Sequence, residues 1–278
     1  MVGQYVLPHH LLSRLAGYIA ECRWAWFKNP FIKWFARTYE VNLSEAQITN
    51  PAAFENFNDF FTRALKPDAR SFVNDPGSIA CPVDGAISQI GDIEAGRIFQ
   101  AKGHEFSTYD LLGGCRELEK EFDGGKFTTI YLSPRDYHRI HMPISGTLRK
   151  MVYVPGKLFS VSPLTTSKVP SLFSRNERVV AIFDTEIGPM AMVLVGAMIV
   201  ASIETVWAGL VTPPKRQLSH IDYGEKIHLK KGEEMGRFKL GSTVVMLFGK
   251  DAMEWEHSLA PDQPVRMGQL YGNESSRT

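Results

Sequence analysis

The sequence lacks the features that would place it outside the ordinary globular class. It has only three cysteines, Cys22, Cys81 and Cys115, without a Cys-x-x-Cys pair, so we expect no disulfide framework and favour a reducing compartment. Its 31 Lys and Arg oppose 30 Asp and Glu, and this balance argues against a general nucleic-acid binder. The hydrophobic fraction of 44% and charged fraction of 22% exclude a disordered, collagen-like or coiled-coil chain.

A long apolar run is also missing. The longest nearly apolar stretch, Met190–Ile203, is shorter than the roughly 20 residues of a membrane-spanning helix, so it predicts a buried strand or strand pair. The opening residues, MVGQYVLPHHLLSRLAG, have no basic n-region and no small-residue cleavage site, so we expect no secretory signal. The sequence therefore predicts a soluble or peripheral protein.

Residues 11–39 combine aromatic side chains with positive charge. The segment holds three of the five tryptophans and an excess of four positive charges. Apolar residues at helical spacing predict one helix, a break at Pro30 and a second short helical stripe after it. This pattern suits a lipid–water interface, although a helical hairpin packed on the protein's own core is the alternative. The residues concerned are Trp24, Trp26 and Trp34, with Arg14, Arg23, Lys28, Lys33 and Arg37 against Glu21.

The rest of the chain predicts an α+β fold, with a β-rich catalytic body preceded by short amphipathic N-terminal helices. A further helix is predicted over 51–65, because Asn50 can cap it and Pro51 suits its first position. Beyond Pro67, short runs rich in Val, Ile, Thr and aromatic residues predict strands. We expect a helical, membrane-associating region over 1–66 and a β-rich body over 67–278. The strand-like runs are 127–132, 148–154, 179–184, 191–203 and 238–248.

One segment, YLSPRDYHRIHMP at 131–143, holds two histidines three residues apart. In a helical turn this spacing would place the imidazoles of His138 and His141 on one face, as acid–base catalysis near neutral pH could use them. A metal site is a weak rival, because no Cys or Glu pair at ligand spacing joins them. Two hydrogen-bonded structural histidines are an equally good interpretation of this segment alone.

Three other segments are weaker candidates. Asp84 precedes Gly85 in CPVDGAIS and resembles a turn residue. The loop 154–163 offers hydroxyls and Lys157 to a polar ligand. In the strand-like run 236–248, Gly241-Ser242-Thr243 predicts a bulge or a close backbone approach. Each of the three is also consistent with ordinary structure.

Taken together and in order, six motifs closely resemble the phosphatidylserine decarboxylase proenzymes of the bacterial type. The resemblance runs from about residue 11 to about residue 272 and assigns no role to 216–230. The motifs are FNDFFTRALKP at 57–67, PVDG at 82–85, YLSPRDYHRIHMP at 131–143, SRNERV at 174–179, SIETVWAG at 202–209 and LGST at 240–243.

The resemblance implies a self-processing precursor. The hydroxyl of Ser242 would attack the carbonyl of Gly241 to form an ester, and elimination and hydrolysis would leave a pyruvoyl group at the new N-terminus. The products would be a beta chain, 1–241, and an alpha chain, 242–278. The family motifs place the base at His141 and the orienting carboxylate at Asp84, which is the logic of a catalytic triad.

The resemblance also implies the second reaction. The pyruvoyl group derived from Ser242 would be the cofactor, with no metal, and would form a Schiff base with the amine of phosphatidylserine. Loss of carbon dioxide would give phosphatidylethanolamine, with His138 positioning the carboxylate and supplying a proton. A serine hydrolase with a persistent Ser242, His141 and Asp84 triad is the alternative enzyme, and a non-catalytic membrane module is a third interpretation.

The expected partner is phosphatidylserine in the bilayer, with no nucleic acid. The resemblance implies peripheral association with the cytoplasmic face of the cell membrane and a homodimer of alpha/beta heterodimers. Each basic residue near an anionic surface contributes on the order of 1 kcal/mol, so the basic segment assists docking but needs aromatic insertion as well.

Overall fold

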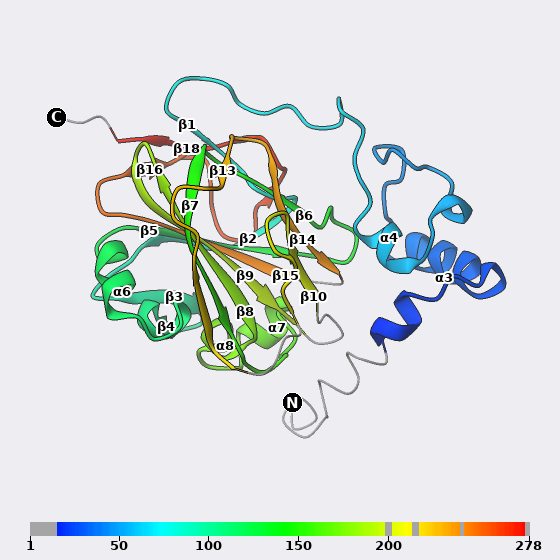
Figure 1. Cartoon of the computed structure of the whole chain (residues 1–278), viewed down its shortest axis with the longest axis horizontal. Helices are drawn as coiled ribbons and strands as arrows, with labels where there is room; N and C mark the ends of the chain where they lie inside the picture. Colours follow the sequence, from blue (N-terminus) through cyan, green and yellow to red (C-terminus); the bar gives the residue numbers. More distant parts are fainter. Residues whose placement is uncertain (1–15, 198–201, 213–216, 240–241, 276–278) are drawn as a thin grey trace.

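The computed structural model describes residues 16–197, 202–212, 217–239 and 242–275. Gly241, the first residue of the predicted cleavage site, lies outside the described residues. Figure 1 shows the helices α3 and α4 at one end of a β-rich body. The predicted α+β class is therefore confirmed.

Within the described residues, nine antiparallel strands form the central sheet, and β15 lies between β9 and β5. β15 is buried along its whole length. A strand covered on both faces needs apolar residues at successive positions, which explains the continuous runs in the sequence. In sheet order the strands are Ser219–Asp222 (β12), Gly146–Val154 (β7), Arg178–Thr185 (β8), Gly188–Gly196 (β9), Ser242–Phe248 (β15), Lys126–Leu132 (β5), Gly85–Asp92 (β2) and Pro264–Val265 (β17), with His228–Leu229 (β13) beside β7.

A four-stranded sheet packs against one face of the central sheet. Its order is Gly209–Leu210 (β11), Ser202–Thr205 (β10), Glu234–Lys239 (β14) and Arg139–His141 (β6). The predicted strand pair within 190–203 is confirmed as β9 and β10. Two smaller sheets complete the body, one of Ser78–Ala80 (β1), Leu270–Glu274 (β18) and Met253–Trp255 (β16), the other of Arg97–Ala101 (β3) and His104–Ser107 (β4).

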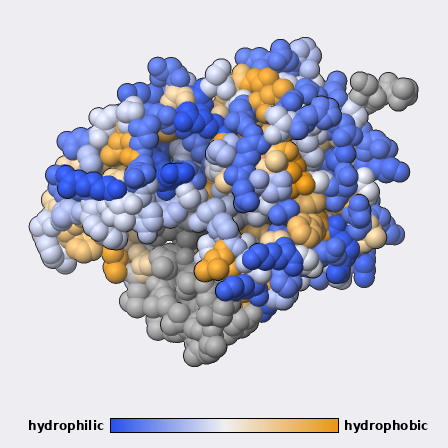
Figure 2. Space-filling view, turned by 180° about the vertical axis from the view of Figure 1, so that it is seen from behind, coloured by the Kyte–Doolittle hydropathy of each residue, from blue (hydrophilic) through white to orange (hydrophobic). Residues whose placement is uncertain are grey.

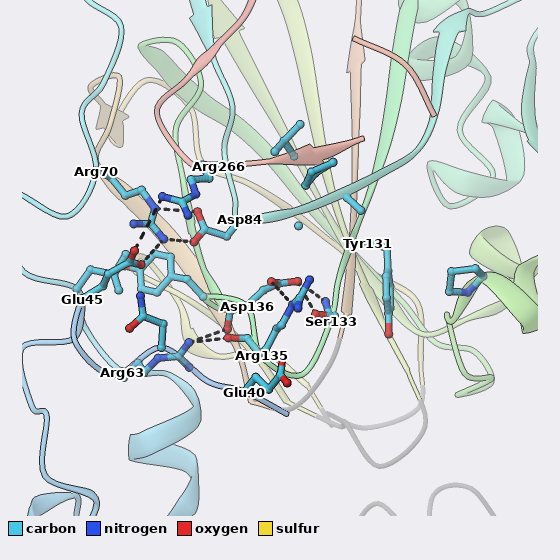
Figure 3. Close-up of a pocket in the computed structure, with 18 residues that line it drawn as sticks. Glu40, Glu45, Arg63, Arg70, Asp84, Tyr131, Ser133, Arg135, Asp136 and Arg266 are labelled. Atoms are coloured by element: carbon cyan, nitrogen blue, oxygen red, sulfur yellow. Dashed lines mark hydrogen bonds and ion pairs between the residues drawn. The ribbon is translucent and has the colours of Figure 1, made fainter. Parts of the chain in front are cut away.

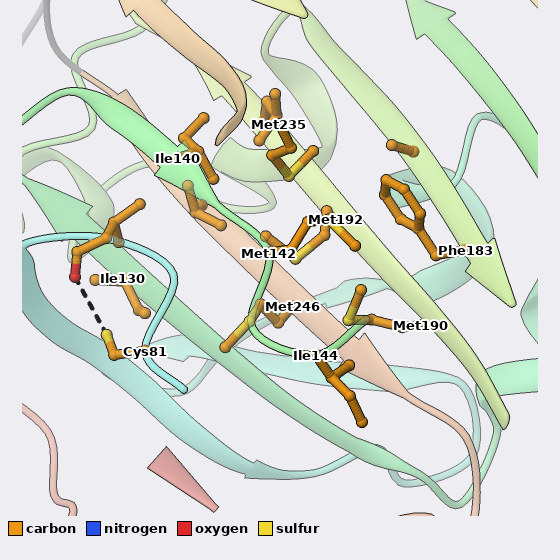
Figure 4. Packing of buried hydrophobic residues seen from close by; sticks show 14 of the residues in the cluster. Cys81, Ile130, Ile140, Met142, Ile144, Phe183, Met190, Met192, Met235 and Met246 are labelled. Carbon is orange, nitrogen blue, oxygen red and sulfur yellow. Dashed lines mark hydrogen bonds between the residues drawn. The ribbon is translucent and has the colours of Figure 1, made fainter. Parts of the chain in front are cut away.

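The core between these two larger sheets is rich in methionine (Figure 4). Met190, Met192 and Met246 from the central sheet meet Met235 of β14 and Met142, which directly follows β6. Unbranched thioether side chains can fill irregular gaps between two packed sheets. The opposite face of the central sheet is covered by short helices, Thr108–Leu111 (α5), Arg116–Phe122 (α6), Pro163–Thr166 (α7) and Leu172–Arg175 (α8).

The N-terminal helices differ from the prediction at Pro30. Residues 16–20 are helical, and α3 then runs without a break over Ala25–Thr38 with Pro30 inside it. A proline inside a helix removes one backbone hydrogen bond and costs about 3 kcal/mol relative to alanine. The inner face of α3 packs Ile32 and Phe35 on the phenylalanines of the next segment, and this packing outweighs the local penalty.

The helix predicted over 51–65 is also wrong in its extent. The side chain of Asn50 accepts from the backbone N–H of Ala52 as predicted, but only a short 3₁₀ turn follows, Pro51–Ala53 (η1). The chain then extends, and the side chain of Asn56 caps a second short helix, Phe57–Phe61 (α4). Asn56 also donates to Glu21 at 3.1 Å, so a tertiary contact fixes the interruption. Among the helices of the described residues, none has both the length and the apolarity needed to cross a membrane.

Candidate active site

Ser242 is the first residue of β15 and is fully buried. It lies opposite Gly196 of β9 and Leu132 of β5. Because side chains alternate along a strand, Ser242 shares the methionine-rich face with Val244 and Met246. Its Oγ has no hydrogen-bond partner among the described residues. Burying a hydroxyl in this way costs on the order of 1–3 kcal/mol, so stability alone does not account for a serine here.

The two histidines do not lie on a helical turn, so the expectation of one shared face is wrong. His138 lies in the extended segment that leads into β6, and His141 is the last residue of that strand. In an extended chain, residues three apart point to opposite faces. His138 is fully buried, with its ring centroid 4.0 Å from that of Phe61. His141 is partly exposed on the other side.

Both ring nitrogens of His141 have partners. Nδ1 lies 2.8 Å from the backbone oxygen of Gly232, an acceptor, so Nδ1 carries the proton. Nε2 then accepts from the hydroxyl of Tyr137 at 3.0 Å. Burial lowers the pKa of His141, so its imidazole is neutral at pH 7. The Nε2 lone pair is therefore of the kind that a general base uses.

His138 is fixed at one nitrogen only. Nδ1 donates to the backbone oxygen of Asp136 at 2.9 Å, whereas Nε2 is buried without a partner among the described residues. Complete burial lowers the pKa of His138 to about 3. Two unpartnered polar atoms, His138 Nε2 and Ser242 Oγ, are thus buried in this part of the molecule.

Asp84 lies directly before β2, in the turn that the sequence predicts. Its carboxylate accepts from Nε of Arg70 at 3.0 Å and from the backbone N–H of Met267 at 2.9 Å. The hydrogen bonds of the described residues do not include one between Asp84 and His141. The two segments nevertheless adjoin, because the backbone N–H of His141 donates to Pro82 at 2.9 Å. The negative charge of Asp84 is also one of the influences that raise the pKa of His141 against the larger effect of burial.

The predicted polar loop 154–163 supports the end of β9 opposite Ser242. The buried side chain of Asn176 donates to the backbone oxygens of both Phe159 and Gly196 at 2.9 Å. Phe159 donates back to the Asn176 side chain at 3.0 Å. Asn176 therefore fixes Gly196, the residue in register with Ser242. Lys157 also belongs to this supporting loop, where it pairs through its backbone with Arg175 and Glu177.

A cavity of about 470 Å³ lies beside Asp84, between the helical region and the β-rich body (Figure 3). Arg63 and Arg70 lie on one side of it, and Tyr131 lies on the other. Sequence reasoning missed Arg63, Arg70 and Tyr137. The available signal for Arg63 was a basic residue directly after an apolar helical stripe. No three His, Cys, Asp or Glu side chains of the described ranges are grouped so that they could hold a metal ion.

Comparison with known proteins gives the family. A family model described as phosphatidylserine decarboxylase matches residues 57–273, and a second, described as PSD, matches 2–40. Proteins named phosphatidylserine decarboxylase proenzyme are similar over nearly the whole chain. That of Pseudomonas fluorescens is 64% identical over 98% of this chain and 96% of its own length. That of Stutzerimonas stutzeri is 65% identical over 98% and 93% respectively.

These matches place the chain in the carboxy-lyase class, the enzymes that release carbon dioxide from a carboxylic acid. More closely, the chain belongs to the phosphatidylserine decarboxylase family. The resemblance drawn from the six motifs is confirmed, and nothing in the matches favours the serine hydrolase alternative.

Proposed function

We propose that the chain is a proenzyme that cleaves itself between Gly241 and Ser242 and then converts phosphatidylserine to phosphatidylethanolamine and carbon dioxide. The decarboxylase activity follows from family membership, and the relatives carry the word proenzyme in their names. The observation that supports the processing step is the buried, unpartnered hydroxyl of Ser242 at the start of β15. The products would be the beta chain 1–241 and the alpha chain 242–278.

The surroundings of Ser242 fit a pyruvoyl group made from it. Ser242 is fully buried on the face of β15 that carries the apolar side chains of Val244 and Met246, and its hydroxyl has no hydrogen bond to lose. A pyruvoyl group supplies an electron sink for the charge that develops when carbon dioxide leaves. This chemistry would need no metal and no external organic cofactor.

In this proposal His141 is the base that removes the Ser242 proton. Its neutral ring, with Nδ1–H held by Gly232, presents Nε2 in the required protonation state. Nε2 must exchange its contact with Tyr137 for one with Ser242. Because the side chain of His141 points away from the methionine-rich core, which Ile140 of the same strand enters, this exchange requires a local rearrangement around β6. The charge of Asp84 would stabilise the imidazolium from a distance, while Gly232 orients the ring.

His138 is the proposed group for the decarboxylation step. Ile140, which points to the same side of the chain as His138, packs in the methionine-rich core that Ser242 also faces. The unpartnered Nε2 can therefore serve a substrate bound at residue 242. The imidazole is neutral in the empty site, so it must gain a proton when the anionic substrate enters and raises its pKa.

The helical region is the proposed membrane-docking surface. Trp24, Trp26 and Trp34 expose 66%, 74% and 54% of their surface, while the inner face of α3 is packed. Seen from behind, the surface at this end carries apolar patches beside strongly hydrophilic ones (Figure 2). We therefore keep the division into a membrane-associating region 1–66 and a body 67–278. Peripheral binding to the cytoplasmic face of the cell membrane and a homodimer of alpha/beta units complete the proposal.

Replacing the serine tests the processing step. Ser242→Ala is expected to remain one chain and to release no carbon dioxide from phosphatidylserine vesicles. Thr129→Val is the matched control, because it removes another buried, unpartnered hydroxyl from the neighbouring strand β5. The control is expected to cleave. Cleavage of Ser242→Ala at the same bond would exclude this function for Ser242.

A further inference from the structure

The Arg63 side chain is a buried cation without a carboxylate partner among the described residues. It is 4% exposed and follows α4 on the wall of the cavity. Nη2 donates to the backbone oxygens of Arg135 at 2.8 Å and Asp136 at 3.2 Å. Nε and Nη1 are buried with no acceptor among the described residues. Burial lowers the pKa of Arg63 to about 10, which still leaves the guanidinium charged at pH 7.

Three carboxylates of the same cavity, those of Asp84, Glu45 and Asp136, are already engaged, and the fourth, Glu40, belongs to an exposed residue. Arg70 binds Asp84 and also Glu45, the latter at 2.9 Å. The carboxylate of Asp136 accepts from the backbone N–H of Ser133 at 2.7 Å and from its hydroxyl at 2.8 Å.

Arg135 and Arg266 also line the cavity, but their side chains are exposed to water. Arg63 differs from them because its unused donors are buried. Leaving a charged donor buried and unsatisfied is costly, which points to an anion that arrives from outside.

We propose that Arg63 binds the phosphodiester of the lipid headgroup in this cavity, an inference that rests on the proposed function. The cavity lies between the helical region with the exposed tryptophans and the strand β5 that flanks Ser242. A lipid entering from the membrane side would thus pass Arg63 on its way to residue 242. A turn of the guanidinium brings Nε and Nη1 to the anion, and an arginine fork matches two phosphate oxygens.

The headgroup also carries a carboxylate, but the chemistry favours the phosphodiester for Arg63. The carboxylate loses its charge as carbon dioxide leaves, so an ion pair with it would stabilise the substrate more than the transition state. The phosphodiester keeps its charge throughout, so binding it strengthens ground state and transition state equally. Loss of Arg63 should therefore raise KM for phosphatidylserine and leave kcat nearly unchanged.

A binding experiment on the full chain separates the two anions. The probes are glycerophosphoserine, glycerophosphocholine, which shares only the phosphodiester, and free serine, which shares only the carboxylate. Calorimetry is run on the chain as purified and on Ser242→Ala, each with and without Arg63→Gln. We expect Arg63→Gln to weaken both phosphodiesters roughly 10- to 100-fold and to leave serine unaffected. Arg116→Gln removes a surface arginine of α6 outside the cavity and should change nothing.

Three outcomes would overturn the proposal. In the first, the phosphodiesters bind equally well to the chain with Arg63 and to Arg63→Gln. In the second, neither phosphodiester binds to the unmutated chain. In the third, Arg63→Gln loses affinity for glycerophosphoserine and serine but not for glycerophosphocholine, which would assign Arg63 to the carboxylate. If Arg63→Gln does not fold, Arg63→Lys replaces it in the experiment, because lysine keeps the buried charge but lacks the paired donors of the guanidinium. If the chain binds the phosphodiesters but neither cleaves itself nor decarboxylates phosphatidylserine, the proposed function is wrong while the phosphodiester site at Arg63 is supported.

Discussion

Three side chains at the site, Ser242, His138 and Arg63, carry buried polar atoms that have no partner among the described residues. Each such atom costs on the order of 1–3 kcal/mol, and substitution by an apolar residue would remove the cost. Native proteins keep few of these groups, and those they keep need an explanation. In the proposed reactions, Ser242 is the nucleophile, His138 carries a proton and Arg63 binds an anion.

The two histidines are expected to separate cleavage from decarboxylation. His141→Ala should block cleavage and therefore all activity, because it removes the proposed base for Ser242. His138→Ala should cleave nearly normally but decarboxylate about 10²–10⁴-fold more slowly, the usual loss for a positioned proton donor. Cleavage is followed on a denaturing gel and carbon dioxide release on phosphatidylserine vesicles.

Thermal stability of each histidine variant controls for simple misfolding. Tyr137→Phe is a second control, since it frees Nε2 of His141 and should leave cleavage intact. The reverse result, uncleaved His138→Ala beside cleaved His141→Ala, would assign the base to the histidine that faces the core. A folded, cleaved His138→Ala enzyme with unaltered turnover would remove His138 from the chemistry.

At the scale of elements, the strands were predictable and the helix boundaries were not. The runs 127–132 and 148–154 lie within β5 and β7, as their content of β-branched and aromatic residues predicts. The continuity of α3 through Pro30 depends on packing against α4, a contact with no local signal. The interruption before α4 depends likewise on Asn56 meeting Glu21.

The motifs indicated which residues belong to the candidate site, but not how these residues are arranged. Motif resemblance located Ser242, the two histidines and Asp84, but His-x-x-His spacing alone suggested a shared helical face. The extended backbone before β6 turns the two rings to opposite sides. Arg70, which holds Asp84, lies 14 residues away in the chain, and no spacing rule connects the two. Their pairing is a consequence of the fold.

The exposed face of α3 should carry much of the membrane affinity. Replacing Trp24, Trp26 and Trp34 together by Ala removes the aromatic surface that inserts at the interface, so sedimentation with anionic vesicles should weaken while self-cleavage continues. Leu164→Ala with Leu210→Ala removes exposed apolar surface outside the helical region and should leave sedimentation unchanged. If the triple variant binds vesicles as well as the unmutated protein, the tryptophans do not dock the protein on the membrane and α3 has only a structural role.

At the scale of the whole molecule, the buried neutral His138 makes stability depend on pH. The unfolded chain binds a proton at this histidine below about pH 6.5, whereas the folded chain does so only near its lowered pKa of about 3. The free energy of unfolding should therefore fall as the pH drops through this window, by about 1.4 kcal/mol per pH unit from His138. Denaturant unfolding of Ser242→Ala, with and without His138→Asn, measures this contribution. An equal slope in the two proteins would contradict neutral burial.

Cleavage should not separate the two products of the native protein. The segment after Gly241 begins with β15, which pairs along seven residues with β9 on one side and β5 on the other. It also supplies β16, β17 and β18, and both faces of β15 are buried. The two chains should therefore elute together in size-exclusion chromatography and separate only in denaturant. Release of the small chain under native conditions would contradict this arrangement.

The central claim is that Ser242 becomes the catalytic group by self-cleavage, and intact-mass analysis of the denatured, purified protein tests it most directly. The account predicts two chains, 1–241 and 242–278, with the smaller lighter by one ammonia than the fragment from simple hydrolysis, because a pyruvoyl group replaces its N-terminal serine. A single uncut chain in a preparation that decarboxylates phosphatidylserine, or a small fragment that begins with unmodified Ser242, would contradict it.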